Sequence, residues 1–211
     1  LVIFYKGRFN EVNVNFLTDE ELSSIREKEF SGKGLELVRD MFVFSCYTGL
    51  AYIDIFNLTK DQLSKGIDGN LWIITNRQKT GSTSNIPLLP VAEEIIKKYE
   101  NHPVSSNSGK LLPVYTNQKV NEYLKTIAEN CGINKKLTFH CARHTFATTV
   151  TLGNNVSMES VSKMLGHKSI KTTQHYAKIL DSKVSQDMGS LKLVLEKKNE
   201  VQKENDKKLG S

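Results

Sequence analysis

Apolar and polar positions follow helical spacing over most of the chain. Between Leu35 and Tyr47, apolar residues recur three to four positions apart, which predicts a buried helix. Gly49 follows at the place where a left-handed residue commonly ends a helix. Similar patterns predict a short helix near residues 52–57 and further helices near 90–100, 117–130, 139–152, 157–165 and 170–178.

The first helix is predicted from its capping residues. Residues 17–22 have the sequence LTDEEL. Thr18 can accept a hydrogen bond from the third helical residue, and Glu21 can reach back to the backbone of Thr18, which together form a capping box. We expect this helix to end near the glycine-containing break at residues 31–34.

The hydrophobic pattern changes between residues 67 and 89. A turn sequence precedes the apolar, β-prone run LWIIT at 71–75, and Gly81 separates this run from a second extended segment that ends at Pro87. These features predict a small antiparallel sheet of two or three strands. The expected fold class is therefore α+β, mainly α with a small antiparallel β-sheet.

Length and composition exclude several classes of protein. The chain has 211 residues, of which 38% are hydrophobic and 25% charged, as is typical of a globular domain. No apolar run approaches the roughly 18 residues of a membrane span, and no apolar N-terminal signal segment is present. Cys46, Cys131 and Cys141 form no CxxC motif. We therefore expect a cytoplasmic protein with free thiols and no membrane partner.

The positive charge is concentrated in one part of the sequence. The net charge is +6, from 29 basic and 23 acidic residues. Residues 133–183 contain eight of the basic and two of the acidic residues, so the rest of the chain, with 21 of each, is neutral. Such a concentration is typical of a site for a polyanion such as nucleic acid. A solvated, lysine-rich face would give the same pattern, so charge alone does not decide between them.

The segment LTFHCARHTF at 137–146 carries residues suited to binding phosphate. Thr138 is the expected N-cap of a helix, which places His140 and Arg143 in its first turns. The N-terminus of a helix favours anions. Arg143 can bind two phosphate oxygens and His140 can donate to a third.

Three more residues extend this chemistry. His167 lies in the Gly-containing sequence MLGHKS, and Tyr176 follows nine residues later. A tyrosine hydroxyl near arginine and histidine donors can attack phosphorus, and Lys79, on the turn of the predicted sheet, can protonate a leaving oxygen. Each residue also has an ordinary explanation, such as a core tyrosine or a solvated lysine, so the prediction depends on their order and spacing together.

Other kinds of site have weaker support. His140 and His144 have the i,i+4 spacing of zinc ligands, but no glutamate lies between them and no nearby cysteine or carboxylate pair completes a set. Nucleotide-binding glycine loops and the GxSxG motif of hydrolases are absent. We expect no metal and no cofactor, with a histidine metalloprotein as a remote alternative.

The motifs LTFHCARHTFAT, MLGHKS and TTQHYAK, in this order, resemble the catalytic domain of the tyrosine recombinases, the phage-integrase family. The family signature is HxxR, then LGH, then a nucleophilic tyrosine about nine residues further on. Upstream, CYTGLAYIDIFNLT at 46–59 resembles the TGLR-x-x-E block, and IPLLP at 86–90 resembles the strand after the β-hairpin lysine. The resemblance covers residues 17–180, and the motifs are most similar to those of integrases from conjugative or mobilisable transposons.

The resemblance implies a domain organisation. Residues 17–183 would form a tyrosine recombinase catalytic domain, after an N-terminal arm or interdomain linker at 1–16. Residues 184–211 would form a helical tail that docks on a neighbouring subunit. The chain would lack the N-terminal core-binding domain of the family. The implied partner is double-stranded DNA, with a monomer free in solution and a homotetramer on DNA.

The resemblance also implies the reaction and the role of each residue. Tyr176 would be the nucleophile that forms a 3′-phosphotyrosine, and Arg143, His140 and His167 would stabilise the phosphate. Lys79 would protonate the leaving oxygen, and His140 would also help to take the proton of Tyr176. The implied function is site-specific DNA recombination, the integration, excision or inversion of a mobile element. Further contacts to DNA are expected from Lys135, Lys136, His144, Lys168, Lys171 and Arg77.

One position departs from the family pattern. The first catalytic arginine should follow TGL, but this chain has Ala51 there, while Asp54 keeps the acidic position. Arg39, on the preceding helix, is the first candidate to replace the missing cation, unless it forms only a surface pair with Asp40, and Arg77 is the second. Without a substitute, the alternative function is a catalytically impaired DNA-binding regulator on an integrase scaffold.

Overall fold

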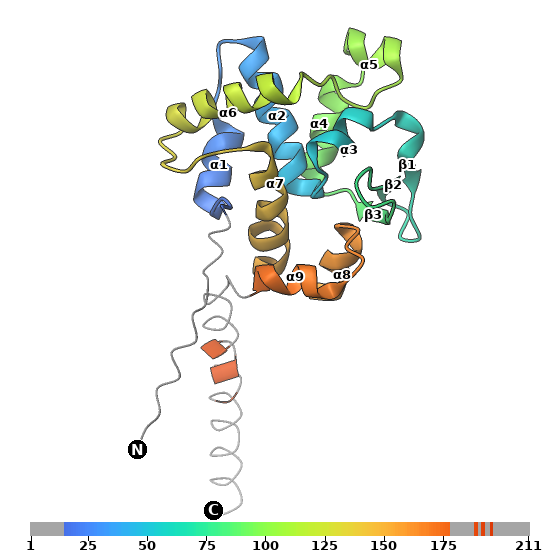
Figure 1. Ribbon diagram of the computed structural model, residues 1–211, viewed down its shortest axis with the longest axis vertical. Helices are drawn as coiled ribbons and strands as arrows, with labels where there is room; N and C mark the ends of the chain where they lie inside the picture. Colours follow the sequence, from blue (N-terminus) through green and yellow to red (C-terminus); the bar gives the residue numbers. More distant parts are fainter. Residues whose placement is uncertain (1–14, 178–187, 190, 193–194, 196–211) are drawn as a thin grey trace, which may run out of the picture.

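The computed structural model describes residues 15–177, 188–189, 191–192 and 195 (Figure 1). The expected arm at 1–16 and tail at 184–211 lie almost entirely outside these residues. The described helices are α1 (Asp19–Glu27), α2 (Lys33–Thr48), α3 (Tyr52–Asn57), α4 (Pro90–Tyr99), α5 (Pro103–Ser108), α6 (Asn117–Asn130), α7 (Phe139–Thr145), α8 (Met158–Met164) and α9 (Ile170–Ala177). None of them is long and apolar enough to cross a membrane.

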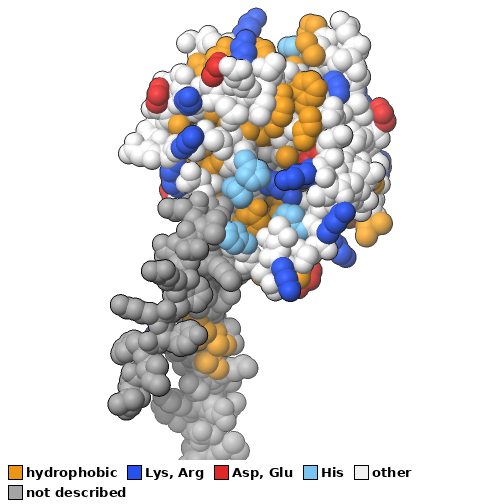
Figure 2. Space-filling model, viewed as in Figure 1, with side chains coloured by type: hydrophobic (Ala, Val, Ile, Leu, Met, Phe, Trp, Pro, Cys, Tyr) orange, Lys and Arg blue, Asp and Glu red, His pale blue; other side chains and the backbone are white. Residues whose placement is uncertain are grey.

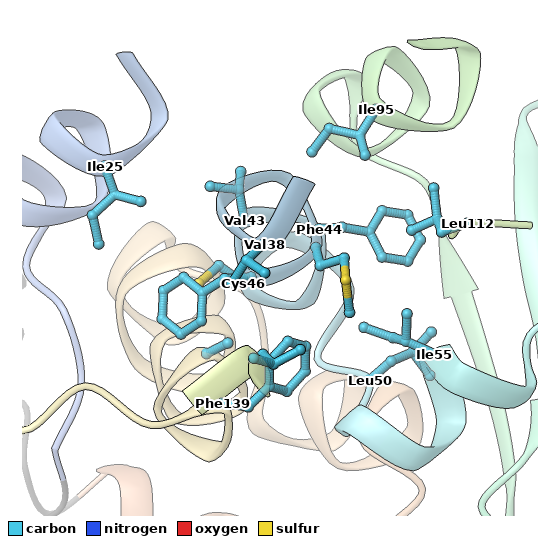
Figure 3. Packing of buried hydrophobic residues seen from close by; sticks show 14 of the residues in the cluster. Ile25, Val38, Val43, Phe44, Cys46, Leu50, Ile55, Ile95, Leu112 and Phe139 are labelled. Atoms are coloured by element: carbon cyan, nitrogen blue, oxygen red, sulfur yellow. The ribbon is translucent and has the colours of Figure 1, made fainter. Parts of the chain in front are cut away.

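Helix α2 lies at the centre of a helical layer, with α1, α4, α6 and α7 packed against it (Figure 1). A helix surrounded on all sides needs apolar residues on every face, and the uninterrupted buried run from Met41 to Phe44 meets this need. Figure 3 shows Val43 and Phe44 of this run among apolar residues of the neighbouring helices, such as Ile25, Ile95 and Phe139. The buried helix predicted from the apolar pattern is confirmed.

The ends of α1 and α2 follow their capping residues. The capping box of Thr18 and Glu21 is present at the start of α1, as predicted. Gly49 ends α2 with φ of 69°, and its N–H donates to the carbonyl of Ser45 at 2.8 Å. A Cβ at Gly49 would lie 2.5 Å from the ring of Phe146, so both the backbone angle and the packing there require glycine.

The small sheet contains three antiparallel strands, β1 (Leu63–Lys65), β2 (Leu71–Asn76) and β3 (Thr83–Pro87), in the order β1-β2-β3. Trp72 pairs with Pro87, and Asn76 pairs with Thr83 at the β2–β3 turn. Figure 1 shows the sheet at one side of the helical layer, next to α8. The predicted α+β class is confirmed.

The structure differs from the sequence expectation after α7. A single helix was expected over 139–152, but α7 ends at Thr145 and continues as a π-helical segment, η2 (Phe146–Thr151), and a short 3-10 turn. Threonine hydroxyls bond back to main-chain carbonyls here: Thr148 Oγ1 donates to His144 O at 2.8 Å and Thr151 Oγ1 to Ala147 O at 2.9 Å. Such side-chain bonds compete with regular helix geometry. Helix α5 was not predicted, because its sequence PVSSNS has no apolar repeat.

A second apolar cluster, formed by residues of η2, α8 and α9, lies below the helical layer. It contains Phe146, Val161, Leu165 and Tyr176. This cluster holds α9, and with it Tyr176, against the continuation of α7. The candidate site forms where this cluster, the end of α2 and the β2–β3 turn meet.

Candidate active site

Arg143 joins three segments that are far apart in the sequence. It lies on α7 after Thr138, which occupies the predicted N-cap position without forming a side-chain cap bond. The side chain is buried, and Nη1 donates to Gly49 O at 2.6 Å while Nη2 donates to Leu165 O at 2.6 Å. Arg143 therefore fixes the end of α2 and the end of α8 to α7, with three of its five N–H groups left outside these two bonds.

The turn between α8 and α9 carries His167 and packs against the β2–β3 turn. Gly166 has φ of 61°, and a Cβ there would lie 2.7 Å from Cγ of Arg77. Ser82 Oγ donates to Gly166 O at 2.6 Å. His167 Nδ1 lies 2.8 Å from Thr173 Oγ1, one turn before Tyr176 on α9. Glycine at 166 thus allows the two turns to meet closely enough to bring Arg77 and His167 into one site.

Tyr176 lies in this site with its ring largely buried, at 6% exposure. Its hydroxyl is 3.2 Å from Nδ1 of His144. Its ring is nearly parallel to that of His167, with an interplanar angle of 9° and centroids 6.4 Å apart. The ring of His140 in turn lies edge-to-face with that of His144, with centroids 4.4 Å apart.

Arg77 and Asp54 form a buried ion pair beside Ala51. Nε of Arg77 lies 3.0 Å from Oδ2 of Asp54, and the same oxygen accepts from the N–H of Ala51 at 3.4 Å. Asp54 Oδ2 therefore bridges Nε of Arg77 and the backbone N–H of Ala51. The other oxygen of Asp54 accepts from Gln78 N at 3.0 Å. Nη1 of Arg77 is buried and has no hydrogen-bond partner among the residues that the structure describes.

The expectation that Arg39 reaches the site is wrong. Its Nε pairs with Asp40, and its Nη1 donates to the carbonyls of Arg26 at 3.0 Å and Lys28 at 2.6 Å. The two carbonyls lie at the end of α1, so they hold the guanidinium of Arg39 there. The twelve residues between Arg39 and Ala51 correspond to about 18 Å along a straight helix, which is too far for an arginine side chain to span.

The remaining predicted cations differ in their surroundings. Lys79 lies exposed on the β2–β3 turn, near enough to His140 for its charge to lower the pKa of that histidine. Lys136, Lys168 and Lys171 are exposed. Lys135 does not fit the expectation of a free DNA contact, because Nζ is bound to Glu21 Oε2 at 2.6 Å and to Phe16 O at 3.0 Å.

His144 also differs from expectation. It was predicted to contact DNA, but it is half-buried and its Nδ1 is directed at the Tyr176 hydroxyl. Figure 2 shows the surface setting: histidine side chains lie next to Lys and Arg side chains in the middle of this face, with apolar surface above and between them. A basic, histidine-rich surface of this kind can hold a phosphate group of a polyanion.

Burial and neighbouring charge set the protonation states of the site. Burial, with the positive charge of Arg143, lowers the pKa of both His144 and His167 to about 4. Burial also lowers the pKa of Arg143 to about 10 and raises the pKa of Tyr176, although Arg143 and Arg77 oppose that rise. At neutral pH the two histidines are therefore neutral, Arg143 is cationic and the Tyr176 hydroxyl is protonated.

No metal site is formed by the described residues, in which no group of three His, Cys, Asp or Glu side chains could hold an ion. His140 and His144 are adjacent but have no third such partner. The described arrangement instead presents two arginines, neutral histidines and a tyrosine around one point. It can bind a phosphodiester, stabilise extra negative charge on it and bring an oxygen nucleophile to it.

Comparison with known proteins identifies the family. The sequence profile of the Phage integrase family matches residues 15–183. Tyrosine recombinase XerC of Rickettsia canadensis is 28% identical over 180 residues, which make up 80% of this chain and 54% of that protein. Tyrosine recombinase XerD of Lacticaseibacillus casei is 30% identical over 172 residues, covering 76% of this chain and 57% of that protein. The chain belongs to the phage integrase family, and it spans little more than half the length of these relatives.

Solved structures share the fold. The crystal structure of XerA recombinase superposes with a TM-score of 0.66 at 21% identity, covering 83% of this chain and 64% of that one. The Tn1549 transposon integrase, solved in complex with a circular intermediate DNA, has a TM-score of 0.58 at 17% identity, covering 81% of this chain and 63% of that one. The predicted tyrosine recombinase catalytic-domain fold is confirmed.

Proposed function

We propose that this chain is the catalytic part of a tyrosine-type, site-specific DNA recombinase that cuts and rejoins double-stranded DNA in the cytoplasm. The observation that carries the proposal is the meeting of Arg143, Arg77 and Tyr176 from three separate segments, with neutral histidines around them. Each of these groups matches a step of phosphoryl transfer. The membership of the chain in the phage integrase family supports the same reaction.

The reaction proceeds in two balanced steps. The hydroxyl oxygen of Tyr176 attacks a DNA phosphorus, its proton passes to a neutral histidine of the site, the bond from phosphorus to the 5′ oxygen breaks, and a 3′-phosphotyrosine and a free 5′-hydroxyl result. Lys79 gives a proton to the leaving 5′ oxygen. In the second step a 5′-hydroxyl from a partner strand gives its proton to Lys79 and attacks the phosphotyrosine, and the released Tyr176 regains its proton from the histidine. The phosphoester is conserved throughout, so the exchange needs no ATP.

Arg77 takes the place of the missing first arginine. Asp54 holds its guanidinium next to Ala51, where the family pattern has the arginine itself, and Nη1 of Arg77 remains buried and unpaired. A buried unpaired donor carries a desolvation cost, which a phosphate oxygen would remove. With this cation in the site, the absence of an arginine at position 51 gives no reason to prefer a DNA-binding regulator.

Several features of the whole protein follow from this assignment. The element mobilised belongs to the conjugative or mobilisable transposon class, as the motif phrasing suggests, and the active assembly is a homotetramer on two DNA duplexes, formed from monomers. Exposed Lys136, Lys168 and Lys171 contact DNA phosphates. Such contacts hold the duplex through a salt-dependent, sequence-independent attraction.

Trapping the covalent intermediate tests the proposal. The full-length protein is mixed, in EDTA, with nicked suicide duplexes from the ends of the element that encodes it, so that the cut strand diffuses away and the adduct accumulates. We expect a 3′-linked protein–DNA adduct with the wild-type protein and none with Tyr176→Phe, because the phenylalanine lacks the attacking oxygen. Tyr115→Phe, which changes a tyrosine outside the site, is the matched control and should form the adduct. DNA binding without any adduct would reject the proposal in favour of the regulator.

A further inference from the structure

The hydroxyl of Tyr176 has one hydrogen-bond partner among the described residues, and it is His144. The distance from Oη to Nδ1 of His144 is 3.2 Å. His140, the histidine of the HxxR motif, does not contact this oxygen and instead lies behind His144, with ring centroids 4.4 Å apart. The histidine that follows the motif arginine is thus the one placed on the attacking atom.

The local backbone explains this placement. His144 is on the last turn of α7, directly after Arg143, and points to the side on which α9 packs. The hydroxyl of Thr148 donates to the carbonyl of His144 at 2.8 Å, in the segment where the helix becomes π-helical. Tyr176 is held in turn by the apolar cluster of η2, α8 and α9. Both partners of the hydrogen bond are therefore fixed by packing before DNA binds.

We propose that His144 accepts the proton of the Tyr176 hydroxyl during DNA cleavage and returns it during rejoining. In cleavage, the O–H bond of Tyr176 breaks, the oxygen forms its bond to phosphorus, and the proton moves to Nδ1 of His144. In rejoining, the phosphorus–oxygen bond breaks and the same proton returns to the phenol oxygen. The inference deepens the recombinase assignment and rests on it.

The charges around His144 suit this role. Burial, together with the charges of His140 and Arg143 on its own helix and of His175 on α9, lowers the pKa of His144 to about 4. His144 is therefore neutral before the reaction, and in the tautomer that carries its proton on Nε2 the Nδ1 atom has a lone pair for the tyrosine proton. A DNA phosphate bound between Arg143 and Arg77 adds negative charge and so favours protonation of His144 when the tyrosine attacks. His144 therefore becomes a stronger base only when the DNA phosphate is bound.

The test replaces the proton acceptor but keeps a hydrogen-bond acceptor. His144→Asn places a carbonyl oxygen near the position of Nδ1, so it can hold the tyrosine hydroxyl without taking its proton. We expect the rate of adduct formation on the nicked duplex to fall about 100-fold or more, as is typical for loss of general base catalysis. His102→Asn, the same change at the N-cap histidine of α5, outside the site, should leave the rate within about twofold of wild type.

A more acidic nucleophile separates proton transfer from positioning. Difluorotyrosine incorporated at position 176 ionises more readily and needs a base less. We expect it to raise the rate of adduct formation of His144→Asn at least tenfold. The rate of the otherwise wild-type protein should change much less. Only a folded variant can be restored in this way, so the result is not confused with misfolding.

The outcomes separate failure of the proposed role of His144 from failure of the proposed recombinase function. A Tyr176-dependent adduct that forms at the wild-type rate in His144→Asn, or a slow variant that difluorotyrosine does not restore, overturns the role of His144 and leaves the recombinase assignment intact. A wild-type protein that binds DNA without forming any adduct overturns both.

Discussion

In the helical layer around α2, Arg39 pairs with Asp40, and beside the small sheet Arg77 pairs with Asp54. Both arginine side chains are largely buried, at 12% and 10% exposure. Around the first pair every partner is structural: Arg39 donates to two carbonyls at the end of α1, and Asp40 accepts from side chains of α4. Around the second pair, Nη1 of Arg77 is buried and unpaired among the described residues.

This difference distinguishes an ion pair with structural partners from one that keeps a buried donor unpaired among the described residues. Charge, burial and an aspartate partner are common to both pairs. Of these two arginines, only Arg77 keeps a buried donor without a partner among the described residues, and only Arg77 acts, together with Arg143, on the pKa values of Tyr176 and His167. A buried donor left unpaired is unfavourable in the free protein, and it is therefore informative about a ligand.

Of the substitutions that test this difference, Arg77→Ala should have the largest effect, which is on DNA cleavage. We expect single-turnover adduct formation to fall about 100-fold to 1000-fold, the range for loss of one preorganised donor to a transition state. The matched change Arg39→Ala should leave that rate within about threefold, while lowering the free energy of unfolding by about 1–3 kcal/mol through loss of buried hydrogen bonds. An Arg39→Ala variant that loses cleavage at wild-type stability would reverse the two roles.

Gly166→Ala should loosen the contact between the two turns. Its φ of 61° is unfavourable for alanine, and the new Cβ would lie 2.7 Å from Cγ of Arg77. We expect a loss of about 2–4 kcal/mol in the free energy of unfolding, from backbone strain and overpacking together, measured by urea denaturation.

Gly132→Ala provides the control for this substitution. Gly132 also has a positive φ, 67°, but nothing lies within 4 Å of the Cβ that would be added. The control should cost about 1 kcal/mol, from backbone strain alone. Equal losses of unfolding free energy in the two variants would mean that the packing of Gly166 on Arg77 does not contribute to stability.

Lower pH should reduce the free energy of unfolding through His144 and His167, by a smaller amount than Gly166→Ala does. The pKa values of His144 and His167 are lowered to about 4 in the folded protein, against about 6.5 in an unfolded chain. The unfolded state therefore takes up protons first as the pH falls, so the stabilisation is complete above pH 6.5 and is lost progressively toward pH 4. Between pH 7 and pH 5 we expect a loss of about 1 kcal/mol per histidine, after allowance for solvent screening.

Urea denaturation at the two pH values measures this effect. His167→Gln keeps a side chain that can bond to Thr173 but removes one titrating group. It should show about half of the pH-dependent loss that these two histidines cause in wild type. A variant with the full wild-type loss would show that His167 does not contribute to it.

Local features of the fold were predictable from the sequence. The capping box of Thr18 and Glu21 and the end of α2 at Gly49 each depend on residues within one turn, so a short stretch of sequence specifies them. The break after α7 was missed, because it depends on hydroxyl-to-carbonyl bonds that compete with an otherwise helical pattern. The missed α5 has only Ser105 buried and carries no periodic signal.

The site was predictable only as far as its motifs reach. The order of the motifs indicated Arg143, His167 and Tyr176 as members of one site, and the structure brings them together. Choosing Arg77 over Arg39 required the pairing with Asp54, 23 positions away in the sequence. The partner of Lys135, Glu21, is separated from it by 114 positions. Such pairings depend on tertiary structure, and no periodicity or spacing in one sequence reports them.

The ion pair of Asp54 and Arg77 has a consequence for how members of this family are found. A reaction requires a positive charge at one point in space, and it does not prescribe which segment of the chain carries that charge. Here the acidic residue of the TGL block, three positions after Ala51, holds an arginine that belongs to the β2–β3 turn. A search that demands arginine directly after TGL would discard this chain as defective, whereas a search for an aspartate there together with an arginine two positions before the hairpin lysine would retain it.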